Sequence, residues 1–87
     1  MSVYMVERDL KGITMEQLAD AQKRAIETSA QFTKNGKQVR YIRTTFVPGE
    51  ERSMCLFEST DPELVRECNE AAEIPFVRIV EALDLTP

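Results

Sequence analysis

Histidine is absent from this chain of 87 residues. Histidine is the commonest metal ligand in proteins and the commonest general base near neutral pH. Its absence excludes nucleophilic catalysis by a cysteine–histidine pair. It also removes the usual basis of a transition-metal site, so we predict no cofactor.

Cysteine and glycine are scarce, with two and three residues. Cys55 and Cys68 lack the CxxC spacing of a zinc or redox site, and helical spacing places Cys68 on an apolar stripe. Both are therefore expected to be small buried hydrophobic residues. The glycines stand one per turn, at positions 12, 36 and 49, which leaves no glycine-rich loop to bind phosphate.

Long apolar runs and a basic excess are also missing. No segment approaches the length of a membrane span, and the N-terminus does not resemble a signal peptide, so we expect a cytoplasmic protein with no membrane partner. The net charge of −4 disfavours nucleic acid, which requires a basic surface. Arg40 and Arg43, with Tyr41 between them, form the one basic cluster. It is either a small-anion site or, as we favour, charge that protects an edge strand from aggregation.

The pattern of apolar and polar residues predicts one α+β domain spanning residues 1–87. Strands are expected at 3–8, 39–47 and around 54–57, with a fourth at 76–83. Thr14 is expected to cap a helix that runs to about Phe32, with Met15, Leu18, Ala19, Ala25, Ile26 and Phe32 on its apolar side. A second helix is expected after Asp61, with Pro62 in its first turn and with Leu64, Cys68, Ala71 and Ala72 on its inner stripe.

The resulting order β-α-β-β-α-β predicts a ferredoxin-like sandwich. In this fold two helices cover one face of a four-stranded antiparallel sheet, with the first and third strands in its centre. The other face also carries apolar residues, and a second copy of the same sheet is its simplest cover. We therefore predict a homodimer through the open sheet face, of the dimeric α+β barrel type.

Two carboxylates are the main candidates for a site. We expect the first and third strands to run parallel, which would place Glu7 and Glu58 side by side at their ends, with Tyr41 near Glu58. These residues could line a polar pocket on the open face, because neighbouring carboxylates persist only with a cation, an arginine or a shared proton. The alternative is that they are solvated strand ends or salt bridges of a dimer interface. If a metal binds, Glu7 and Glu58 would supply oxygen ligands for a hard cation.

Several short motifs resemble a known family. They are YMVERD at 4–9, CLFE at 55–58, DPE at 61–63, VRE at 65–67, and Pro75 followed by RIVE at 78–81. Together they resemble the small bacterial family catalogued as domain of unknown function 4242, whose members include nickel-responsive proteins. The resemblance implies a ferredoxin-like fold, a homodimer and, in some members, nickel bound through histidines.

The chain departs from the family pattern at the metal-binding positions. Arg43 stands where relatives commonly carry a histidine on the second strand, and Cys68 stands where they often carry one on the second helix. A guanidinium does not ligate nickel, and a core-facing cysteine is a poor lone ligand, so we do not expect nickel binding.

Two functions therefore stay open. The first is a dimeric, non-enzymatic binding or accessory protein that holds a small molecule through Glu7, Glu58, Tyr41 and Arg43. The second is a cofactor-independent enzyme, an oxygenase or isomerase, in which Glu7 or Glu58 acts as a buried base and Tyr41 or Arg43 stabilises an anionic intermediate. A closed apolar pocket with one of these carboxylates pointing into it would favour the enzyme.

Overall fold

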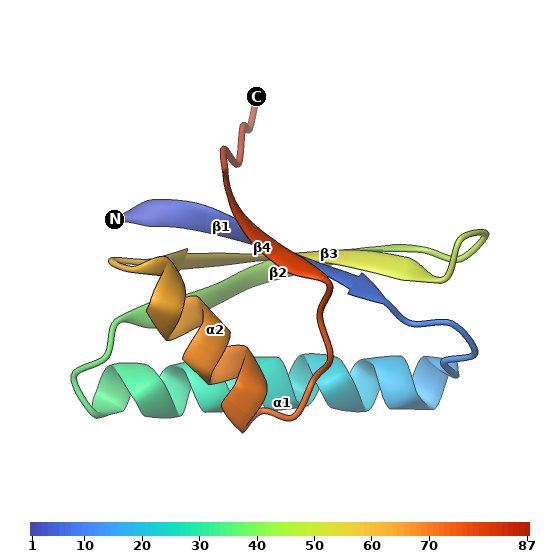
Figure 1. The fold of residues 1–87 in the computed structure, drawn as a ribbon, viewed down its shortest axis with the longest axis horizontal. Helices are drawn as coiled ribbons and strands as arrows, with labels where there is room; N and C mark the ends of the chain where they lie inside the picture. The colour runs from blue at the N-terminus through green and yellow to red at the C-terminus, as the bar shows by residue number, and fades with distance from the viewer.

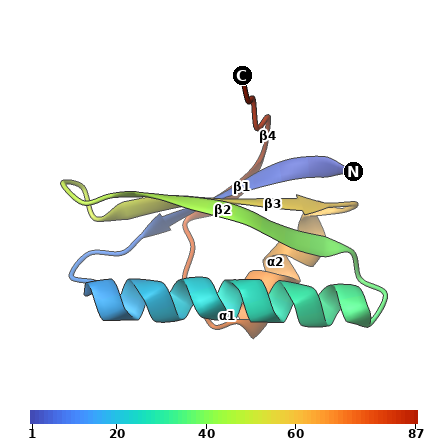
Figure 2. The ribbon, with the colours of Figure 1, turned by 180° about the vertical axis from the view of Figure 1, so that it is seen from behind.

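The computed structural model describes residues 1–87, which form one sheet with two helices on one side of it (Figures 1 and 2). The elements follow the order β1 (Ser2–Asp9), α1 (Met15–Lys34), β2 (Val39–Val47), β3 (Arg52–Ser59), α2 (Pro62–Ala71) and β4 (Arg78–Ala82). The predicted order and the ferredoxin-like α+β fold are confirmed. Neither helix combines the length and the apolar character that crossing a membrane requires.

The sheet has the strand order β2-β3-β1-β4, so β1 and β3 are central as predicted. The expectation that these two strands run parallel is wrong, because β1 pairs antiparallel with β3. The β2–β3 hairpin makes β3 antiparallel to β2, and β3 lies between β1 and β2. The crossover through α1 makes β1 parallel to β2, so β3 runs opposite to both.

Capping residues in the sequence mark the start of both helices and the end of α1. Thr14 caps α1 through a reciprocal capping box with Gln17. Gly36, at φ +87°, supplies the left-handed residue after α1. Asp61 accepts a hydrogen bond from the Glu63 amide at 2.8 Å, at the start of α2.

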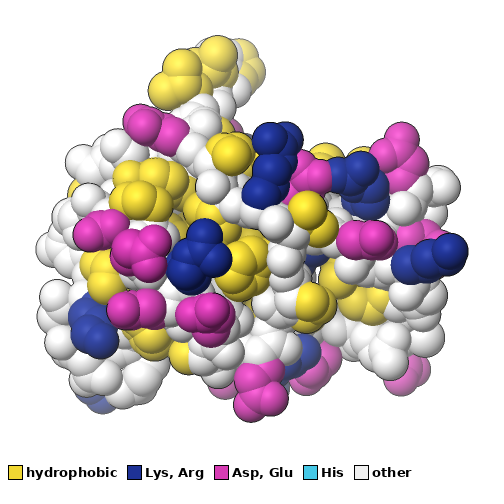
Figure 3. Space-filling view, in the orientation of Figure 1, with side chains coloured by type: hydrophobic (Ala, Val, Ile, Leu, Met, Phe, Trp, Pro, Cys, Tyr) yellow, Lys and Arg dark blue, Asp and Glu magenta, His cyan; other side chains and the backbone are white.

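The surface is a mixture of acidic and basic side chains in the view of Figure 3. Hydrophobic side chains project at the top of that view, where Figure 1 places the C-terminal end beyond β4. This end lies on the side of the sheet away from the helices. Leu83 and Leu85 in this segment are 80% and 84% exposed.

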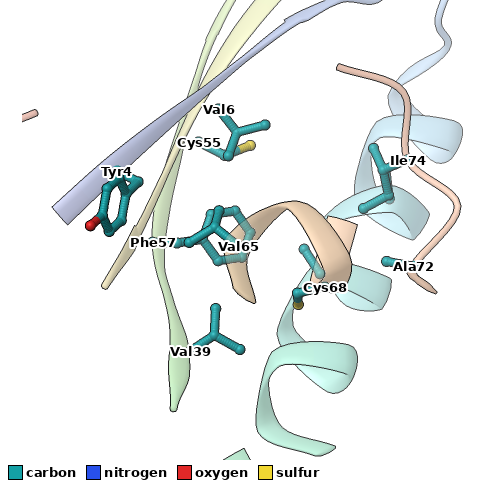
Figure 4. Close-up of a cluster of buried hydrophobic side chains, with 11 residues drawn as sticks. Tyr4, Val6, Val39, Cys55, Phe57, Val65, Cys68, Ala72 and Ile74 are labelled. Atoms are coloured by element: carbon teal, nitrogen blue, oxygen red, sulfur yellow. The ribbon is translucent and has the colours of Figure 1, made fainter. Parts of the chain in front are cut away.

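The core fills the space between the sheet and the helices. Figure 4 shows Val6, Cys55 and Phe57 on the sheet directed toward the helices, with Val65 and Cys68 on α2 opposite them. Cys68 is 1% exposed, which confirms its predicted place in the core. The predicted apolar side of α1 is partly wrong. Its buried residues are Ala21, Ala25 and Ser29, so small side chains are the fully buried ones on α1. Three residues predicted on the apolar side are exposed, namely Met15, Ala19 and Ile26.

Candidate functional site

The open face of the sheet has an apolar centre. Along β1, Tyr4, Val6 and Arg8 face the helices, so the alternating residues face away from them. The apolar side chains at the centre of this open face are only partly buried: Val3, Met5, Met54, Leu56 and Val80. Such a surface is typical of an interface rather than of a sheet face in water.

Glu7 lies at one end of this apolar centre and binds two arginines. Its Oε1 accepts a hydrogen bond from Arg78 Nε at 2.8 Å, and its Oε2 forms an ion pair with Arg52. The side chain of Glu7 is only 10% exposed. The carboxylate is therefore satisfied by the neighbouring strands, since Arg52 lies on β3 and Arg78 on β4.

Glu58 lies at the opposite end of the same face. It pairs with Arg40 at 3.2 Å, and the backbone register sets Val3, not Glu7, beside Glu58. Glu7 is four residues further along β1, a distance of roughly 13 Å along a strand. The predicted juxtaposition of Glu7 and Glu58 is therefore wrong, and its cause is the antiparallel pairing of β1 with β3.

Arg43 lies on the open face of the edge strand β2, opposite Leu56. Its Nη2 atom is 3.0 Å from the Oδ2 atom of Asp84, which follows β4. Because β2 and β4 form opposite edges of the sheet, this ion pair requires the segment after β4 to extend over the open face. The partner of Arg43 is therefore the C-terminal segment, and neither Glu7 nor Glu58.

Tyr41 lies on the helix side of the sheet, so the prediction that it joins Glu58 is also wrong. It is opposite Phe57 in the register, and the two rings meet edge to face with centroids 5.6 Å apart. Its hydroxyl accepts a hydrogen bond from the Gln22 side chain of α1 and contacts Thr44 Oγ1 at 2.6 Å. A register shift between Tyr41 and Arg43 turns Arg43 to the opposite face from Tyr41.

Sequence reasoning missed a buried polar group on the helix side. Arg8 is 2% exposed and donates to the Asn69 side chain and to the Pro75 carbonyl, with Asn69 itself 1% exposed. The signal was present in the sequence, because Arg8 has the same strand alternation as Tyr4 and Val6. This alternation places the side chain of Arg8 on the face of the sheet that packs against the helices, although the residue is charged.

Cys68 lies close to this arginine. Burial raises the pKa of the Cys68 thiol to about 11, and the positive charge of Arg8 partly opposes that rise. The thiol is therefore protonated at neutral pH. A protonated, buried thiol is a poor nucleophile.

The donor set does not fit nickel. No three residues among histidine, cysteine, aspartate and glutamate lie together in a way that could hold a metal ion. Arg43 and Cys68 occupy the positions where the resemblance implies histidines. Arg43 is an ion-paired guanidinium, and Cys68 is a lone buried thiol. Glu7 and Glu58, the proposed oxygen ligands, each bind arginine.

Comparison with known proteins identifies the family. The family model described as nickel responsive protein SCO4226-like matches residues 4–82. The crystal structure of SCO4226 from Streptomyces coelicolor A3(2) is similar in fold, with a TM-score of 0.80 and 21% identity over 98% of this chain and 100% of that chain. No curated protein matches the sequence. The match of the family model over nearly the whole chain shows that this protein belongs to the SCO4226-like nickel-responsive family.

Proposed function

We propose that the protein is a homodimeric binding or accessory member of its family, which pairs through the open sheet face and does not itself bind nickel. The observation that carries this proposal is the partly buried apolar centre of that face, formed by residues of β1, β3 and β4. Its bordering charges are already neutralised within the chain, so a second copy could cover the face without leaving an unpaired charge.

The segment after β4 supports the same interface. Asp84 fixes it over the open face through Arg43, while Leu83 and Leu85 stay largely exposed. Burying one such leucine contributes roughly 1.5–3 kcal/mol. Contact with a partner subunit would therefore stabilise both the segment and the dimer. A small ligand would then be held between the two sheets, near Glu7, Glu58 and Arg43.

The enzyme hypothesis gains no support from these contacts. It requires Glu7 or Glu58 to point into a closed apolar pocket as a free base. Both carboxylates instead bind arginine, and neither lines the interior cavity of the fold. The binding role is therefore the function that we propose, in the cytoplasm, where two unpaired cysteines fit the reducing conditions.

Native mass spectrometry of protein purified without chelator tests this proposal, because it reports the oligomer and any retained ligand together. We expect a dimer without stoichiometric nickel. Leu56→Lys, in the apolar centre of the face, should give a monomer, while Gln31→Lys on the exposed side of α1 should leave the dimer intact. A monomeric wild-type protein, or one nickel ion retained per subunit, would contradict the proposal.

A further inference from the structure

We propose that a cavity between α1 and the sheet binds a small organic monoanion, such as a short-chain carboxylate. The cavity has a volume of about 150 Å³ and lies on the opposite side of the sheet from the proposed dimer interface. A cavity of about this volume can hold a molecule the size of benzene. The site is independent of the proposed dimer and of its interface.

Arg8 supplies the positive charge. Arg8 is buried and is one of the residues that line the cavity, and its guanidinium has no carboxylate within ion-pair distance. Its protein partners are two neutral acceptors, Asn69 Oδ1 and the Pro75 carbonyl. Arginine has five N–H donors, and a buried charge without a counterion is costly. An anion in the cavity would satisfy the remaining donors and neutralise that charge.

Ser53 supplies a second donor beside Arg8. The residue is 1% exposed and lines the cavity, and its Oγ is the one buried side-chain oxygen or nitrogen without a hydrogen-bond partner. Ser53 stands directly opposite Arg8 in the β1–β3 register. Opposite residues on one face of a sheet have Cβ atoms about 5 Å apart, so the hydroxyl and the guanidinium can contact the same carboxylate.

The rest of the cavity wall is mostly hydrophobic and therefore favours a ligand with an apolar part. Seven of the eleven lining residues are hydrophobic: Leu10, Leu18, Ala21, Ala25, Phe46, Cys55 and Ile74. Two of these are alanines of α1, whose short side chains leave the space. Figure 4 shows two of these residues, Cys55 on the sheet and Ile74 in the segment after α2. A hydrated inorganic anion would gain nothing from such a wall, whereas a short alkyl chain would.

Part of the cavity wall reaches the surface of the protein. Gln22, another lining residue, is exposed on α1 and donates to the Tyr41 hydroxyl of β2. In this proposal the ligand enters between α1 and β2, where this hydrogen bond would have to open. Tyr41, selected from the sequence as a ligand-binding candidate, would then border the entrance to a different pocket from the one expected.

Titration of the ¹⁵N-labelled protein with butyrate tests the proposal by NMR. We expect saturable shifts of the amides of Arg8, Ser53 and Cys55, and much weaker shifts with butyramide, which has the same shape without the charge. Ser53→Ala should weaken butyrate binding about tenfold, because a hydrogen bond to a charged group is lost. It should still fold, since the Ser53 hydroxyl has no partner to lose.

Thr60→Ala is the matched control, because Thr60 is exposed before α2 and does not line the cavity, and it should bind butyrate as the wild type does. Equal binding of butyramide, or unchanged affinity in Ser53→Ala, would overturn the proposal. A titration without saturable shifts would also overturn the proposal, because it would mean that butyrate does not bind in the cavity.

Discussion

At the scale of single residues, the charges on the open sheet face form ion pairs within the chain. Glu7 contacts Arg52 and Arg78, Glu58 contacts Arg40, and Arg43 contacts Asp84. The types of residue at these positions were apparent from the sequence. Their partners were not, because each pair depends on the direction of a neighbouring strand.

Replacing Glu7 with glutamine should destabilise the protein. The change leaves two arginines close together without their shared carboxylate, and we expect a loss of roughly 2 kcal/mol in the free energy of unfolding. Urea denaturation at neutral pH measures this loss. Glu58→Gln is the matched control, because Glu58 has one arginine and is more exposed, so its replacement should cost only about 0.5 kcal/mol. Equal losses would contradict the role given to Glu7.

The raised pKa of Cys68 predicts a loss of stability in alkali. An unfolded cysteine ionises near pH 8.5, whereas burial raises the pKa in the folded protein to about 11. Between these values the unfolded chain releases a proton that the folded chain retains. The free energy of unfolding should therefore fall from about pH 8.5 to about pH 11, by at most about 1.4 kcal/mol per pH unit from this group.

Cys68→Ala isolates this effect, because the other ionisable groups are the same in both proteins. Denaturation of the two proteins across that pH range should show a shallower decline in the variant. Parallel pH profiles would show that Cys68 is not responsible.

Tyr41 shows the limit of sequence reasoning at this scale. Its place in a strand was correct, but the face that it occupies was not. The expected pairing follows from counting back from the β2–β3 hairpin, and the irregularity between Tyr41 and Arg43 shifts that count by one residue. Nothing in the residues 39–47 marks that irregularity. Arg8, in contrast, could have been assigned to the core from its alternation with Tyr4 and Val6.

At the scale of elements, local signals were sufficient to predict where helices begin. Thr14 and Asp61 cap α1 and α2 as expected, because a cap depends on residues only two or three positions away. The end of α2 depends on a distant residue instead. Arg24 of α1 donates hydrogen bonds to the carbonyls of Ala72 and Glu73. The residues around position 72 do not predict this contact, because Arg24 is far away in the sequence.

Removing the cap of α2 should weaken the fold by a measurable amount. Asp61→Ala leaves the Glu63 amide without its acceptor, and we expect a loss of about 1 kcal/mol in the free energy of unfolding. Thermal denaturation followed by circular dichroism measures the change. The neighbouring exposed Thr60, which makes no side-chain hydrogen bond, gives the control variant Thr60→Ala, with an expected change below about 0.5 kcal/mol. A loss as large in Thr60→Ala would argue against Asp61 as the cap.

At the scale of the whole molecule, two helices on one side of a four-stranded sheet leave the other side open (Figure 2). This architecture could be predicted because the order of helices and strands permits few topologies. The direction of β3 relative to β1 was predicted wrongly, although the hairpin and the crossover together determine it. That single error produced the false pairing of Glu7 with Glu58. The interior cavity could not be predicted, since it depends on how α1 packs against the sheet.

Sedimentation at micromolar concentration tests most directly the claim that a second copy covers the open face. We expect the wild-type protein to sediment as a dimer and the Leu56→Lys variant as a monomer, because a lysine in the apolar centre would be buried without a partner. Gln31→Lys should sediment as the wild type does. A wild-type protein that sediments as a monomer would contradict the proposed interface.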